Sequence, residues 1–533
     1  MVLEVPHFKV YSLCFLVGAY LSTNLSYAGE LTVKKALDTS ANIYQTQRAN
    51  EKTEDAYAAT LNPSLVSVYK SKVLTGDFAI NHSQIKQGGY EDATSRSFTD
   101  FRLNSNTSII ENLMSLALKA DQNYRPSNQS DGFIVDRLLS TGELSKTDKY
   151  SAILNFAMPN PEYVGLDWQA LYSKSTADNS IDDGPSLNSS NKGLTLRVYN
   201  GRNLRRIGFN LSAQQNDTAR RNNQNFKSTI LNGNINFGLF NDLSFVLTGS
   251  DTTYDLSSET QVANPRNIDT TSYGAGLKWS PSNNRFIEIT FNNLEQELQK
   301  TEYIGVSSNW AFTNRTSLAL NYGKRFYGDA YSAKFTYNLK SLRSSMSYSE
   351  DVTSFSRLSV TEESLGVFVC PIGSTDLLDC FQPNDLSYEL QPGEEFINFN
   401  SIVNDLTDEV ILNKTAQATI GYSLKKLKVS INYRYTDTEY LESQRSRKNQ
   451  SISINSNYQL SKTTNISLNS SLSKIENKTT VDEDSITITV SLKKSLSQNL
   501  VVNSSFRYLD RSSEQVIRDL TDKRLTLGFT YSF

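Results

Sequence analysis

The last residues of the printed sequence, 525–533, alternate strictly between apolar and small polar side chains. Leu525, Leu527, Phe529, Tyr531 and Phe533 occupy one set of alternate positions, while threonine, glycine and serine occupy the other. Successive side chains of a β-strand point to opposite faces, so this pattern predicts a strand with one apolar face and one small polar face. A soluble sheet can end in such a strand, so the rest of the chain has to decide what kind of sheet this is.

The same alternation recurs through the carboxy-terminal half, for example at residues 427–435 and 486–492. The composition agrees with this pattern. The chain has 28 tyrosines and 25 phenylalanines but only 11 prolines, and its mean hydropathy is only -0.45. A transmembrane barrel has this composition, since one half of each strand faces lipid and the other half a wet lumen. We therefore predict an all-β, transmembrane antiparallel β-barrel. A secreted all-β adhesin or solenoid is the alternative.

Short turns between alternating runs give a strand count. The candidate turns are Lys70–Val73, Glu111–Met114, Pro159–Pro161, Asn200–Asn203, Phe240–Asp242, Ser280–Asn284, Ala311–Arg315, Lys340–Leu342, Lys425–Lys426, Leu460–Thr463 and Lys494–Ser497. In outer-membrane barrels the short turns face the periplasm and the long loops face outside. With both chain ends periplasmic, these turns predict about 24 strands, within a range of roughly 22–26.

Polar segments between the strands predict long extracellular loops, and the longest is residues 351–413. The others are Gln45–Asp55, Gln87–Thr94, Pro126–Ser145, Ser175–Asn191, Asp217–Asn225 and Asp255–Asp269. Segment 351–413 is acidic, with Arg357 as its single basic residue. A stretch of this length is usually functional or disordered. It is either a plug in the lumen, a lid outside it, or a solvated loop.

Residues 1–28 have the pattern of a cleaved export signal. Lys9 precedes the apolar stretch Val10–Leu21, which is too short to span a bilayer, and Ser26-Tyr27-Ala28 is a cleavage site. The expected mature chain, residues 29–533, is a single barrel domain of the Gram-negative outer membrane. Its expected partners are membrane lipid, lipopolysaccharide and the barrel assembly machinery, for which Phe529, Tyr531 and Phe533 would form the assembly signal.

Two cysteines remain after the expected cleavage, Cys370 and Cys380. In an oxidising compartment this pair predicts a local disulfide that closes a short loop in segment 351–413. A free pair or a metal site is the alternative, but no histidine lies nearby to complete a zinc shell.

Residues 310–354 contain a more specific pattern than alternation. The chain resembles the outer-membrane β-barrel family associated with PEP-CTERM/exosortase systems, in which a strand ends Y-G-x-R-F-Y/F-G and a later strand ends Y-S-E. The matching residues are Trp310, Tyr322, Gly323, Arg325, Phe326, Tyr327, Gly328, Tyr331, Tyr348, Ser349 and Glu350. The family's usual proline after the tryptophan is replaced by Ala311. The resemblance implies an outer-membrane barrel linked to an exopolysaccharide and exosortase surface system.

An architectural role for the same residues is the alternative to substrate contact. Gly323 and Gly328 would mark a bulge or bend where a strand leaves the membrane. Arg325 would pair with Glu350 or Asp351, while the aromatic residues Phe326, Tyr327 and Tyr331 would belong to an interfacial girdle.

Several functions are disfavoured by composition. The net charge of -3 gives no basic domain, so no nucleic-acid partner is expected. The mature chain keeps only His82, which we place on a lumen-facing position, so a Ser-His-acid hydrolase is not expected. No phosphate-binding loop or metal-ligand spacing stands out. We therefore predict no enzyme activity, no cofactor and no metal. The amino-terminal residues begin to alternate near Leu31, so no plug domain is expected before the first strand.

Basic residues on the polar positions of the strands suggest a lumen that attracts anionic sugars. They are Arg325, Lys334, Arg343, Lys428, Arg434 and Arg507. Pairing with lumen carboxylates is an equally open explanation. The favoured function is a porin-like channel or assembly component for extracellular polysaccharide, with the polymer and its periplasmic export components as partners. The alternatives are a general diffusion porin and a structural or adhesive surface barrel without an open pore.

Overall fold

The structure is a computed structural model of the chain. It describes residues 29–48, 52–89, 94–126, 137–138, 144–178, 187–204, 206–220, 225–240, 242–257, 266–282, 284–296, 299–354, 364–371, 394–400, 410–441, 445–477, 482–514 and 519–533. No helix in these ranges is long and apolar enough to cross a membrane.

Almost all of the described residues belong to one 24-stranded antiparallel sheet that closes on itself. Its strands are β1 (Glu30–Arg48), β2 (Glu54–Lys70), β3 (Leu74–Gly88), β4 (Thr94–Ile110), β5 (Met114–Pro126), β6 (Leu144–Ala157), β7 (Val164–Ala177), β8 (Leu187–Asn200), β9 (Ile207–Arg220), β10 (Asn225–Gly238), β11 (Leu243–Ser257), β12 (Arg266–Ser282), β13 (Arg285–Gln296), β14 (Gln299–Thr313), β15 (Thr316–Arg325), β16 (Gly328–Asn338), β17 (Leu342–Ser354), β20 (Val410–Ser423), β21 (Leu427–Tyr440), β22 (Ser446–Ser461), β23 (Thr464–Asn477), β24 (Glu483–Ser495), β25 (Leu500–Ser513) and β26 (Leu520–Ser532).

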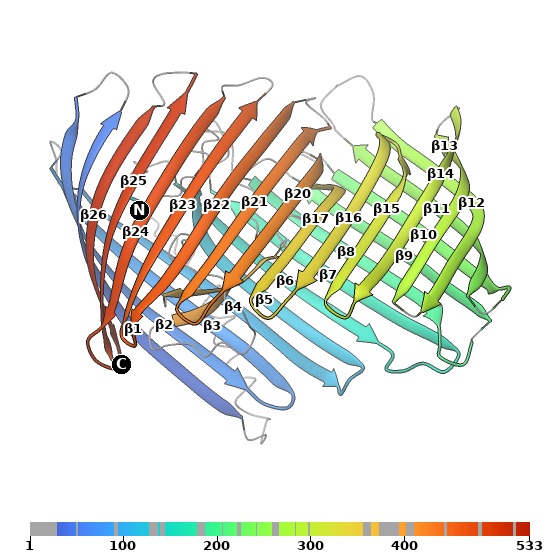
Figure 1. Cartoon of the computed structure of the whole chain (residues 1–533), viewed down its shortest axis with the longest axis horizontal. Coiled ribbons are helices and arrows are strands. Elements are labelled where there is room, and N and C mark those ends of the chain that lie inside the picture. Colours follow the sequence, from blue (N-terminus) through green and yellow to red (C-terminus); the bar gives the residue numbers. More distant parts are fainter. Residues whose placement is uncertain are drawn as a thin grey trace, which may run out of the picture.

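Each strand pairs with its neighbours in the chain, and the first strand pairs with the last, which closes the ring. In Figure 1 the wall from β15 to β25 lies in front and the wall from β2 to β9 lies behind, and the two walls meet near β12. The predicted all-β, transmembrane antiparallel barrel of about 24 strands is therefore confirmed.

The short turns fall where the sequence predicted them, and each joins two consecutive strands from Lys70–Leu74 to Ser495–Leu500. These turns, the start of β1 and the end of β26 lie together at one end of the barrel, which we call the turn end. The opposite end, where the longer connections lie, is the loop end. Two loop-end connections are short: β13 is followed by β14 after Gln296, and only Phe326 and Tyr327 separate β15 from β16.

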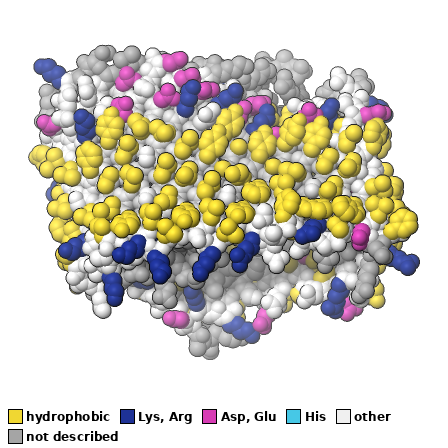
Figure 2. All heavy atoms as spheres, viewed as in Figure 1, with side chains coloured by type: hydrophobic (Ala, Val, Ile, Leu, Met, Phe, Trp, Pro, Cys, Tyr) yellow, Lys and Arg dark blue, Asp and Glu magenta, His cyan; other side chains and the backbone are white. Residues whose placement is uncertain are grey.

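A broad apolar belt surrounds the outside of the barrel, as Figure 2 shows on the face formed by the front wall. It arises because the apolar member of each alternating pair points outward, as at Ile289, Phe291 and Ile304, which are 53%, 55% and 55% exposed. In water such exposure would be costly, whereas in lipid it is favourable. The belt therefore identifies the surface that spans a membrane.

Segment 351–413, which the sequence predicted as one long loop, contains strand residues. β17 continues to Ser354 and β20 begins at Val410, so both ends of the segment are barrel strand. Between them β18 (Ser364–Pro371) and β19 (Glu394–Asn400) form an antiparallel hairpin. Cys370 lies in β18 but its side chain is not described, and Cys380 lies outside the described residues. The predicted disulfide and the choice between plug, lid and solvated loop therefore stay predictions, as do the export signal 1–28 and its cleavage site.

Candidate functional site: the lumen and its loop-end mouth

The lumen wall is lined by the polar member of each alternating pair. In β21, Ile431 and Tyr433 are exposed on the outer belt, so Ser430, Asn432 and Thr436 face inward. Serine, threonine and asparagine recur at equivalent positions, and many are buried against one another. Examples are Ser64, Ser83, Asn191, Asn216, Thr218, Ser228, Thr290, Asn292, Thr415, Asn469 and Thr487. The wall thus offers hydroxyl and amide groups that can exchange hydrogen bonds with a polar solute.

The six basic residues singled out from the sequence lie on these inward positions. Arg343 and Lys428 are close to the turn end, Arg434 and Arg507 are near the middle of their strands, and Arg325 ends β15 at the loop end. Lys334 lies in β16, which runs beside β15. They belong to five strands, so positive charge is distributed along the wall rather than gathered in one cluster.

A hydrophobic cluster lies at the loop end, and we call it the mouth cluster. Its buried members are Phe226, Tyr254, Val352, Val410 and Leu412, and the partly buried Ile268, Phe326, Tyr327 and Leu441 pack against them. β10 and β11 carry two of these residues and β17 and β20 carry three, yet five strands separate the two pairs in the sheet. The cluster therefore joins parts of the barrel that are not neighbours.

The turn between β15 and β16 makes this contact. Phe326 meets Tyr254 edge-on with ring centroids 5.5 Å apart, and Tyr254 stacks on Phe226 at 6.1 Å. The hairpin can turn this tightly because Gly328 adopts a φ of 113°. A residue with a Cβ would be strained in this backbone conformation, whereas glycine is not. Burial raises the pKa of the Tyr327 hydroxyl, so this group is a neutral member of the cluster. The girdle role predicted for Phe326 and Tyr327 is therefore replaced by inward packing.

The remaining signature residues lie mostly on the outer surface. Trp310 stacks at a tilt beside Trp279 in the belt, with ring centroids 5.6 Å apart, and Tyr322 and Tyr331 pair at 5.2 Å. The Arg325 guanidinium donates to the main-chain carbonyl of Glu350 at 3.4 Å. The carboxylate of Glu350 instead accepts a bond from Tyr348.

A second contact at the loop end brings a loop residue against the inner wall. The Arg137 guanidinium donates to the Asp100 carboxylate at 2.6 Å and to the Ser83 hydroxyl at 3.2 Å. It also lies over the rings of Phe98 and Tyr124, 5.1 and 6.0 Å from their centroids. Asp100 and Ser83 face inward and are buried, so this ion pair holds Arg137 against the inner wall near the loop end. No local pattern in the sequence predicted this contact, because Arg137 lies in the polar segment Pro126–Ser145, which was expected to be an extracellular loop.

The front and back walls of the barrel meet near β12 (Figure 1). Gly274 and Gly276 face inward there, and a Cβ at Gly276 would lie 2.0 Å from the main-chain carbonyl of Ile289. Across this corner Asn234 of β10 donates to the Glu288 carboxylate of β13 at 3.0 Å. Thr248 of β11 likewise donates to Asn292 of β13 at 3.0 Å. Inner side chains of strands that are not adjacent in the sheet are therefore joined by hydrogen bonds at this corner.

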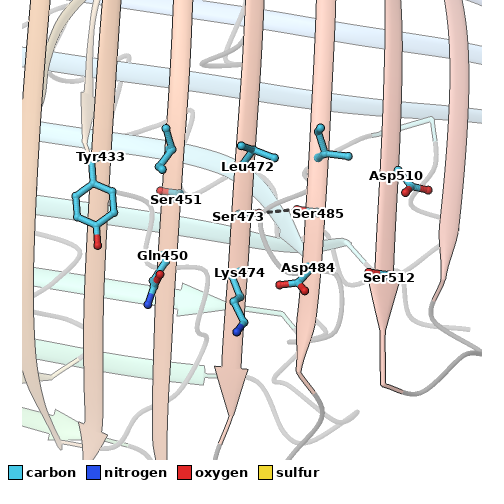
Figure 3. Close-up of a pocket in the computed structure, with 12 residues that line it drawn as sticks. Tyr433, Gln450, Ser451, Leu472, Ser473, Lys474, Asp484, Ser485, Asp510 and Ser512 are labelled. Atoms are coloured by element: carbon cyan, nitrogen blue, oxygen red, sulfur yellow. Dashed lines mark hydrogen bonds between the residues drawn. The ribbon is translucent and has the colours of Figure 1, made fainter.

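A shallow groove of 380 Å³ lies on the outer wall across β21–β25 toward the loop end. Figure 3 shows Lys474 and Asp484 side by side on adjacent strands, with Asp510 beyond them. The apolar residues Ile452 and Leu472 continue the belt into the groove. Apolar and charged groups therefore meet in one groove at the border of the belt.

His82 lies on the outward face of β3, opposite to the lumen-facing position predicted for it, because its neighbours Ser83 and Ile85 occupy the buried inner positions. Its Nδ1 lies 2.8 Å from the Thr99 hydroxyl. Within the described ranges no group of three or more His, Cys, Asp or Glu residues could hold a metal ion.

The closed sheet, the apolar belt and the polar lumen define the class: a membrane-spanning β-barrel of the kind found in outer membranes. No family model and no curated relative matches the chain.

Solved structures do match it at low identity. The siderophore receptor PirA of Pseudomonas aeruginosa is 10% identical, with 93% of this chain and 80% of that chain covered and a TM-score of 0.35. The F3-3 variant of the FrpB iron transporter of Neisseria meningitidis is 10% identical, with coverages of 96% and 82% and a TM-score of 0.43. A loop-deletion mutant of OmpT, an outer membrane protein of Vibrio cholerae, is 9% identical, with coverages of 95% and 100% and a TM-score of 0.30. Likenesses at this level carry no argument about the activity of this chain.

Proposed function

We propose that the chain is an outer-membrane channel for extracellular polysaccharide, exported to the membrane through a cleaved signal at residues 1–28. The observation that carries the proposal is the recurrence of serine, threonine and asparagine side chains at inward positions of strands all around the barrel. A sugar polymer presents hydroxyl groups along its whole length, so such a wall can replace its hydrogen bonds to water at every step.

The basic residues of the wall support an anionic polymer as the substrate. Arg343, Lys334, Arg434 and Arg325 occupy successive levels from the turn end to the loop end. Charges distributed in this way attract an anionic chain without holding it at a single site. The link to an exosortase surface system rests on the resemblance of residues 310–350 and is part of the proposal.

The channel is gated in this proposal. Porins with about 16–18 strands already contain an aqueous channel, so a 24-stranded barrel without an obstruction would leak small solutes. The mouth cluster joins strands that are not neighbours, and Arg137 lies against the inner wall, so both add side chains to the loop end of the lumen. This favours a dedicated channel over a general diffusion porin.

The same observation favours a second candidate, a structural or adhesive barrel without an open pore. In that case the mouth cluster would be permanent, and the acidic segment 351–413 would carry the function. The two candidates differ in one measurable property, which is whether the lumen ever conducts ions.

Single-channel recording of the refolded mature chain in a planar bilayer tests the proposal. A conductance that an anionic polysaccharide blocks from the turn-end side, and that neutral dextran of equal size blocks less, is the expected result. A conductance insensitive to both polymers would indicate a diffusion porin. If neither the natural chain nor the Phe326→Ala variant, in which the mouth cluster is weakened, conducts ions, both the polysaccharide channel and the diffusion porin are excluded.

A further inference from the structure

The turn end of strands β13–β25 carries a row of basic residues, which we call the basic rim. Its members are Arg285, Arg315, Lys340, Lys425, Lys426, Lys462 and Lys494. The turns that hold them contain no aspartate or glutamate. In Figure 2 a line of lysine and arginine side chains follows the lower edge of the apolar belt on this face.

The rim differs from the turns on the opposite wall, where two basic residues have acidic partners. There Lys72 lies 3.2 Å from the Glu111 carboxylate, and Arg202 lies 3.6 Å from that of Glu162. Among the ion pairs between described residues, none involves Lys340, Lys425, Lys426, Lys462 or Lys494. The rim therefore presents a concentrated positive charge that its own turns do not neutralise.

Large apolar side chains accompany the rim charges. Leu339, Leu424, Leu460 and Leu496 are 41%, 48%, 46% and 55% exposed, and each lies within two residues of a rim lysine. Phe312 is 51% exposed and lies three residues before Arg315. Lysine beside an exposed leucine suits a membrane interface, where the leucine enters the acyl region and the ammonium group extends to the headgroups.

We propose that the basic rim binds the headgroups of anionic phospholipid in the membrane leaflet next to the turn end. An acidic soluble protein would match the charge but would leave the leucines in water, so a lipid surface fits both features. This inference is independent of what passes through the lumen. Its functional consequence is that anionic lipid would collect along one wall of the barrel and hold that wall at a fixed depth.

Spin-labelled lipids test this proposal directly. The mature chain is refolded in phosphatidylcholine bilayers, and the fraction of motionally restricted label is compared for phosphatidylglycerol and phosphatidylcholine by electron spin resonance. One lysine near an anionic surface raises the binding constant for that surface by about five-fold. Averaged over all the lipids that contact the barrel, the natural chain should therefore prefer phosphatidylglycerol to phosphatidylcholine by several-fold. Because the charges are exposed, about 1 M salt should reduce this preference strongly.

A rim variant carries glutamine at Lys340, Lys425, Lys426, Lys462 and Lys494. It should lose more than half of the preference, while a control variant with Lys72→Gln and Arg202→Gln should keep it. Heat-dependent migration in electrophoresis checks that both variants form the barrel. If one variant does not form it, the salt dependence of the natural chain still tests the proposal. Equal binding of the two lipids by the natural chain, or a preference that survives both the rim substitutions and high salt, would overturn the proposal.

Discussion

The Phe326→Ala substitution tests whether the mouth cluster acts as a gate. Phe326 projects from the two-residue turn between β15 and β16 onto Tyr254, with the rings edge to face at 5.5 Å. Its other ring contact, to Tyr327 at 5.1 Å, lies within the same turn and persists however the turn moves. Of the two ring contacts of Phe326, therefore, only the one with Tyr254 joins the β15–β16 turn to a distant strand of the mouth cluster.

The size of the effect follows from that single contact. An aromatic pair contributes about 0.5–1.5 kcal/mol beyond the area it buries. Removing it should therefore raise the ratio of open to closed states by about 2- to 13-fold, and the lost apolar burial of Phe326 adds to this. The barrel itself should remain intact, because no strand pairing depends on the side chain.

The assay is the open fraction of single channels at a fixed voltage, recorded for the natural chain, Phe326→Ala and Phe312→Ala. Phe312 is a matched control, because it also lies at a turn but at the opposite end of the barrel and is 51% exposed. We expect only the first variant to raise the open fraction. If all three chains show the same open fraction, the mouth cluster does not gate the lumen.

Three other substitutions test separate parts of the barrel. Gly276→Ala places a Cβ 2.0 Å from a carbonyl of β13 and should lower stability to urea by about 1–3 kcal/mol, whereas Gly249→Ala, with open space around it, should not. Arg137→Ala should destabilise the chain by leaving the buried Asp100 carboxylate alone, and adding Asp100→Asn should recover part of the loss in the same urea titration. Phe533→Ala should reduce the amount of barrel in the outer membrane of cells while leaving refolding in detergent unchanged.

The barrel could be predicted from the sequence because its signals are local. Alternation has a period of two residues, and each short turn interrupts it within a few positions, so the turn at Lys425–Lys426 and the terminal strand at 525–533 could be placed by inspection. The number of strands followed from the turns alone. At the short loop-end connection Phe326–Tyr327 the sequence indicated only a bulge or bend at Gly328, whereas the structure has a two-residue turn in which Gly328 adopts a positive φ.

The contacts inside the barrel could not be predicted in the same way, since they join residues far apart in the chain. Nothing local to Arg137 indicates that it meets Asp100, and nothing local to Phe326 indicates Tyr254 as its neighbour. The predicted orientation of the His82 side chain, into the lumen, was wrong for a related reason. Its strand carries polar residues on both faces, so the choice between inside and outside depends on pairing with β2 and β4.

The pairing of β1 with β26 has a consequence for how this molecule can be made. It joins the two ends of the chain through a register that runs from Ala36 opposite Ser532 to Arg48 opposite Leu520. Thr526 also donates a side-chain bond to Asn42, across a sequence separation of 484 residues. Bringing such distant strands together costs about 5 kcal/mol of chain entropy, and no part of that cost is recovered until the final strand is present.

Before closure, the sheet would have two edges whose backbone groups have no partner in lipid, where each unpaired group costs several kcal/mol. Partial insertion is therefore not a resting state for this chain, because every intermediate short of β26 retains both edges. Folding must either complete in one step or proceed with its edges paired to another protein. The order of synthesis thus makes the last strand both the final piece of the wall and the step that commits the whole chain to the membrane.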